Sequence, residues 1–126
     1  MASSKRKSQR KITGGRFRPF RGKRKFELVS SPIHTKLTDT PKRKSIRLMG
    51  GNLKHVTLTT NVLNVTDKKG KTQKTEMTNV IENPSNPHLV RRNIMTKGAI
   101  VETKLGKARI TSRPGQEGTV NGILLA

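Results

Sequence analysis

The distribution of charge constrains this chain more than any other feature of its sequence. Its 126 residues carry 28 Lys and Arg against 7 Asp and Glu, a formal net charge of +21, or one uncompensated positive charge for every six residues. A compact body of this size would repel itself strongly unless a polyanion neutralised it. The charge therefore predicts a polyanionic partner.

The positive charge is densest in residues 1–26, which hold 11 Lys or Arg, no acid and only four residues that are Leu, Ile, Val or Phe. Gly14, Gly15, Pro19 and Gly22 interrupt any long helix, and so few apolar side chains cannot offset the chain entropy lost on folding. A solvated tail is the plain alternative. However, all three Phe of the protein lie here among the cations, where they can stack on bases or dock on the protein's own body. We therefore predict that residues 1–26 are a basic, mostly irregular extension that binds nucleic acid.

The rest of the chain favours β structure. Residues 27–44 are predicted to be a turn-rich linker that ends in a second basic cluster, and residues 45–126 a folded body. Short β-type segments run through this body, separated by turns that contain Gly or Pro. The segments are residues 45–49, 55–65, 72–81, 94–96, 99–103, 107–111 and 119–125. Asn86 and Pro87 are expected to open one short helical turn between them. We expect an all-β fold, a small antiparallel barrel of about six short strands. Closure would remove the exposed edges of a core too small to protect them.

Several classes of function are disfavoured by the sequence. The absence of Cys excludes disulfides and thiolate zinc sites. The seven acids are scattered, and His34, His55 and His88 are isolated, so no catalytic or metal-ligating group is suggested. The triplet at residues 70–72 resembles the end of a phosphate-binding loop, but Val65 stands where that motif needs Gly. No apolar run reaches the length of a membrane span, and no secretory signal opens the chain. We expect no enzyme activity, no metal and no cofactor.

Nucleic-acid binding is the remaining class, and the residue types limit its mode. The body has no aromatic residue, so contacts are expected from Lys and Arg to phosphates and from Asn, Ser and Thr to sugars, not from base stacking on a sheet. A DNA-compacting chromatin protein is the alternative that the composition leaves open. A mitochondrial transit peptide over residues 1–26 is disfavoured because Gly and Pro interrupt the amphipathic helix it would need.

Seven short motifs, in this order along the chain, resemble the small-subunit ribosomal protein S8e family of archaea and eukaryotes. They are RKITGG (10–15), GKRKFEL (22–28), RLMGGN (47–52, followed by Lys54), NPSN (83–86), LVRRNI (89–94), TKGAI (96–100) and TSRPGQ (111–116). The end at Ala126, without a longer C-terminal extension, is similar to the archaeal members. The resemblance implies a structural, cytoplasmic protein of the small ribosomal subunit, with a β-barrel body and an N-terminal extension buried in RNA.

The resemblance also implies the partners, which are small-subunit ribosomal RNA and neighbouring small-subunit ribosomal proteins. No membrane, small-molecule substrate or homo-oligomer is expected. The residues expected to bind RNA are Lys5, Arg6, Lys7, Arg10, Lys11, Gly14, Gly15, Arg16, Phe17, Arg18, Phe20, Arg21, Lys23, Arg24, Lys25, Lys42, Arg43, Lys44, Arg47, Gly50, Gly51, Asn52, Lys54, Arg91, Arg92, Lys97 and Arg113.

Overall fold

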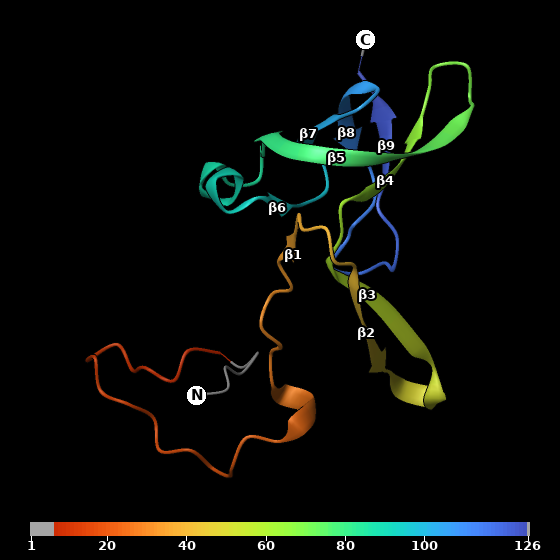
Figure 1. Cartoon of the computed structure of the whole chain (residues 1–126). Helices are drawn as coiled ribbons and strands as arrows, with labels where there is room; N and C mark the ends of the chain where they lie inside the picture. Colours follow the sequence, from red (N-terminus) through yellow and green to blue (C-terminus); the bar gives the residue numbers. More distant parts are fainter. Residues whose placement is uncertain (1–6, 126) are drawn as a thin grey trace. The chain divides into compact units, whose positions relative to one another are not determined.

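The computed structural model describes residues 7–125 and divides into two compact units, Met1–Pro32 and Ile33–Ala126 (Figure 1). The described part of the first unit is mostly irregular, as predicted. Its regular features are a single bridge between Arg10 and Arg16 and one short 3-10 turn, η1 (Lys25–Glu27).

A closed barrel of five strands occupies much of the second unit. The strands are β4 (Val62–Thr66), β5 (Thr72–Glu82), β7 (Ile100–Thr103), β8 (Gly106–Ile110) and β9 (Asn121–Leu124), paired in that order. Leu63, Val65, Val101, Ala108 and Ile110 are almost completely buried within it. The prediction of a small all-β barrel is confirmed. One pairing, between β4 and β9, is parallel, because five strands of alternating direction cannot close a barrel without one parallel pair.

The remaining strands form a separate sheet of four. It contains β1 (Thr35–Lys36), β2 (Lys42–Arg47), β3 (Leu53–Thr59) and β6 (Ile94–Met95), in the order β2-β3-β1-β6. A 3-10 turn, η2 (Met49–Gly51), joins β2 to β3, and this hairpin projects away from the barrel (Figure 1). Another 3-10 turn, η3 (Pro87–Arg92), precedes β6. Its cap is the predicted one, since the Asn86 Oδ1 accepts a hydrogen bond from the His88 N–H at 2.9 Å.

Two boundaries differ from the sequence-based prediction. Residues 55–65 are not one strand, because the chain leaves the four-stranded sheet after Thr59 and enters the barrel at Val62. Thr60 makes this break, since its buried hydroxyl accepts a hydrogen bond from the Val62 N–H at 3.1 Å. Within residues 27–44, predicted to be a linker, the structure has β1 and the first half of β2, held by pairing with β3.

Candidate nucleic-acid interface

The N-terminal unit presents its cations outward. Lys5 and Arg6 lie outside the described residues. From Lys7 to Lys25, every side chain predicted to bind RNA is exposed except that of Arg21, which is half-buried. Phe17 and Phe20 are 55% and 91% exposed and line a hollow of about 320 Å³ with Lys7 and Arg18. Exposed rings beside cations are suited to contact stacked bases and phosphates together.

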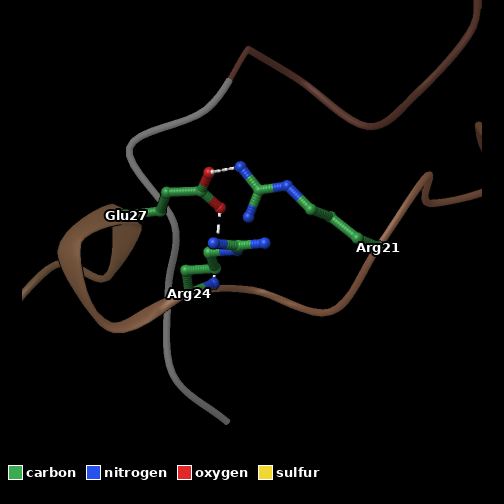
Figure 2. Close-up of polar contacts among 3 residues, drawn as sticks. All are labelled: Arg21, Arg24 and Glu27. Carbon is green, nitrogen blue, oxygen red and sulfur yellow. Dashed lines mark hydrogen bonds and ion pairs between the residues drawn. The ribbon is translucent and has the colours of Figure 1, made fainter.

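Glu27 organises two of the arginines in this unit, and Figure 2 shows how they converge on its carboxylate. Its Oε1 lies 2.5 Å from the Arg21 Nη2, and its Oε2 accepts a hydrogen bond from the Arg24 backbone N–H at 3.4 Å. The Arg21 Nη1 is buried and has no hydrogen-bond partner among the described residues. Glu27 thus holds Arg21 in a fixed orientation with one donor group unused. The sequence signal for this role is that Glu27 is the first acid of the chain.

The β2–β3 hairpin carries the second group of predicted residues. Residues 40–66 contain five Lys or Arg and no acid. Cross-strand pairs place Arg43 and Arg47 on the same face as Thr57 and Leu53, whereas Lys44 and Lys54 alternate onto the opposite face. The hairpin is therefore positively charged on both faces. The predicted contacts of this segment fall on one projecting element, the prong (residues 42–54).

The tip of the prong is apolar and has a defined backbone. Gly50 and Gly51 have φ values of 71° and 77°, which L side chains rarely adopt, and the Leu48 N–H donates to the Asn52 carbonyl at 2.7 Å. This is the Gly-containing turn predicted between the β-type segments at residues 45–49 and 55–65. Met49 is 90% exposed, and its neighbour Leu48 and the first residue of β3, Leu53, are exposed as well. The sequence pattern predicts no role for these apolar residues.

A third set of predicted residues converges on the body. Arg91 and Arg92 are exposed in the last turn of η3. Lys97 and Arg113, 16 positions apart in the chain, line one pocket of about 280 Å³. The Lys54 ammonium donates a hydrogen bond to the side chain of Gln116, which lines the same pocket. The fold thus connects the prong to the loop that contains Arg113.

Three of the six acids of residues 33–125, Glu76, Glu82 and Glu102, lie on β5 and β7, and the other three, Asp39, Asp67 and Glu117, lie in loops. Among residues 33–125 as described, only Glu76 forms an ion pair, at 2.5 Å from Lys104. The hydrogen bond and the positive charge of Lys104 lower the pKa of the Glu76 carboxyl. The cations of the prong and of the pocket therefore have no acidic partner within the described body.

The part of the chain that the structure describes contains neither a candidate metal site nor a helix that could span a membrane. Within residues 7–125 there is no group of three His, Cys, Asp or Glu placed to hold a metal ion. Each helix of this described part is a 3-10 turn of three to six residues, and none could cross a membrane.

Comparison with known proteins gives a consistent result over nearly the whole chain. The family model of ribosomal protein S8e matches residues 4–125. Proteins named small ribosomal subunit protein eS8 from Methanocorpusculum labreanum and Methanocella arvoryzae are each 52% identical to this chain, covering 94% and 95% of it and 95% and 96% of their own lengths. The corresponding protein of Methanococcus aeolicus is 50% identical over 94% of this chain and 93% of its own length. The chain therefore belongs to the ribosomal protein S8e family.

Proposed function

We propose that this protein is a structural constituent of the small ribosomal subunit that binds ribosomal RNA through Lys- and Arg-phosphate contacts and supports subunit assembly. Membership of a ribosomal protein family agrees with the expectation of a non-enzymatic protein. The curated relatives are named as small-subunit proteins, which supports a cytoplasmic location within that particle.

The observation that carries the proposal is the unbalanced charge of the prong. The prong has five cations and no acid, whereas the five barrel strands carry three glutamates against three cations, Lys74, Lys107 and Arg109. A surface that binds only one side of an RNA helix needs cations on one face. A prong charged on both faces is suited instead to insertion between two RNA segments, where phosphates lie on either side.

The N-terminal unit supports the same function by a different route. Residues 1–32 contain a single acid, Glu27, and few of the described side chains are buried, so neutralising RNA phosphates would supply the free energy that orders this unit. The barrel would act as the rigid body that positions this extension and the prong. Neighbouring small-subunit proteins are the other expected partners, and a homo-oligomer is not part of the proposal.

Sedimentation of cell extract on a sucrose gradient tests the location. We expect the protein to sediment with the small ribosomal subunit and to be released by high salt. Its affinity for protein-free small-subunit ribosomal RNA should fall with salt, with a log–log slope magnitude of about 0.7–0.9 per phosphate contacted. Co-sedimentation with DNA, as expected of a chromatin protein, would contradict the proposal, as would an affinity for RNA that is independent of salt.

A further inference from the structure

The pocket lined by Lys97 and Arg113 contains more than two cations. Its lining also includes the hydroxyl groups of Ser85 and Thr96 and the side chain of Gln116. Met95 and Pro114 line it too, and because both are almost completely buried they form its floor. The pocket therefore combines positive charge, hydrogen-bonding groups and an apolar floor, and none of its lining residues is acidic.

A buried asparagine fixes the polar side of this pocket. Asn83 is only 2% exposed, and its Oδ1 accepts hydrogen bonds from the Thr96 hydroxyl at 2.8 Å and from the Ser85 N–H at 3.1 Å. Its Nδ2 donates to the Ile94 carbonyl at 3.3 Å. A buried polar group with its hydrogen bonds satisfied is rigid, so Thr96 and the backbone of Ser85 are held in place before any ligand arrives. Ser85 itself is exposed, and its hydroxyl lies 3.4 Å from that of Thr96, a distance typical of a weak hydrogen bond.

The opposite side is fixed by close backbone packing. A side chain at Gly115 would place its Cβ 3.0 Å from the Ile33 carbonyl oxygen, so the loop that bears Arg113 lies directly against the chain before β1. The Arg113 carbonyl also accepts hydrogen bonds from the Gln116 and Glu117 N–H groups, at 2.8 and 2.9 Å. The pocket thus has two ordered sides. Its volume of about 280 Å³ is just below the usual range of small-ligand pockets. This volume suits a group the size of one nucleotide and is too small for an RNA helix.

We propose that this pocket holds a single nucleotide of the bound RNA. Lys97 and Arg113 contact its phosphate, the ribose lies on Met95 and Pro114, and the Ser85 hydroxyl hydrogen-bonds the ribose 2′-hydroxyl. The proposal rests on the proposed function, because RNA supplies the nucleotide. A 2′-hydroxyl contact is what allows a protein to distinguish RNA from DNA, so this pocket would contribute that selectivity without any aromatic residue.

The test measures binding of the full-length protein to protein-free small-subunit ribosomal RNA transcripts. Lys97→Gln with Arg113→Gln should lower the magnitude of the log–log salt slope by about 1, since both cations contact the same phosphate and the slope scales with the number of phosphates neutralised. Ser85→Ala should weaken binding by about two- to tenfold and leave the slope unchanged, because it removes a hydrogen bond but no charge. The matched controls are Lys68→Gln with Lys69→Gln, at the β4–β5 turn, and Thr78→Ala, on the exposed surface of β5. Thermal unfolding of each variant checks that the fold is retained.

A second measurement locates the nucleotide. Transcripts carrying random 2′-deoxy substitutions are selected for binding to the wild-type protein, and positions where the substitution interferes are mapped. One such position should lose its interference with Ser85→Ala and keep it with Thr78→Ala. The pocket proposal is overturned if the wild-type protein binds the transcript but both pocket variants match their controls in affinity, slope and interference. No binding of the wild-type protein to the transcript would instead contradict the proposed function.

Discussion

At the scale of single residues, the barrel depends on the absence of a side chain at Gly122. A Cβ at this position in β9 would lie 2.9 Å from the Arg109 carbonyl oxygen and 3.4 Å from the Leu63 Cδ1. We therefore expect Gly122→Ala to lower the free energy of unfolding by about 1–3 kcal/mol, the usual cost of overpacking a core. Urea denaturation of the full-length protein measures it.

Gly22→Ala is the matched control, because a Cβ at Gly22 has no neighbouring atom within 4 Å. Its effect should stay within about 0.5 kcal/mol. Equal stability of the two variants would show that the barrel wall relaxes around the added methyl group.

Also at the scale of residues, the pair of inward-facing residues Met77 and Val80 departs from the two-residue period of a strand. Register shifts in β5 explain this, and the Asn79 Oδ1 stabilises the irregularity by accepting a hydrogen bond from the Val80 N–H at 2.9 Å.

At the scale of elements, the prong is the part of the body in which RNA contacts are expected to be most concentrated. Replacing Lys42, Arg43, Lys44 and Arg47 together by Gln should lower the magnitude of the salt slope for ribosomal RNA binding by about 3, at 0.7–0.9 per contact. The four side chains are exposed, so thermal unfolding should change little. Affinity measured over a series of salt concentrations checks the prediction.

The control for the prong is a barrel element with the same charge. Lys68, Lys69, Lys71 and Lys74 lie at the β4–β5 turn and the start of β5, are exposed, and are not among the residues predicted to bind RNA. Replacing these four by Gln removes the same net charge. If both quadruple variants reduced the slope equally, binding would follow total charge, and the prong would have no special role.

At the scale of the whole molecule, the hydrophobic core lies in one unit and the densest positive charge in the other. The largest fully buried side chains, such as Leu63, Ile94, Met95 and Ile110, all belong to the unit Ile33–Ala126. Deleting residues 1–32 should therefore leave a body with a cooperative unfolding transition, while its affinity for ribosomal RNA falls steeply because the densest cations are removed. Circular dichroism during thermal unfolding, together with RNA titration, measures both effects. An unfolded truncated chain would show that the first 32 residues belong to the core.

The sequence by itself determined the fold class, the family and the residue types expected to meet RNA. Charge imbalance, Gly- and Pro-containing turns and short apolar segments are local properties, so the extension, the tight turn at Gly50 and Gly51 and the cap at Asn86 could be read from them. Net charge likewise indicates a polyanion without any knowledge of the fold.

Only the tertiary structure decided which distant residues meet. The break at Thr60 contains neither Gly nor Pro, and it follows from the passage of the chain between two sheets. The pocket brings Ser85 and Lys97 to Arg113, and the prong reaches the same loop through Lys54 and Gln116. Such contacts depend on strand register and on chain paths through space, which a pattern of neighbouring residues does not contain. That is why the sequence could name Lys97 and Arg113 as candidates but could not show that they share one pocket.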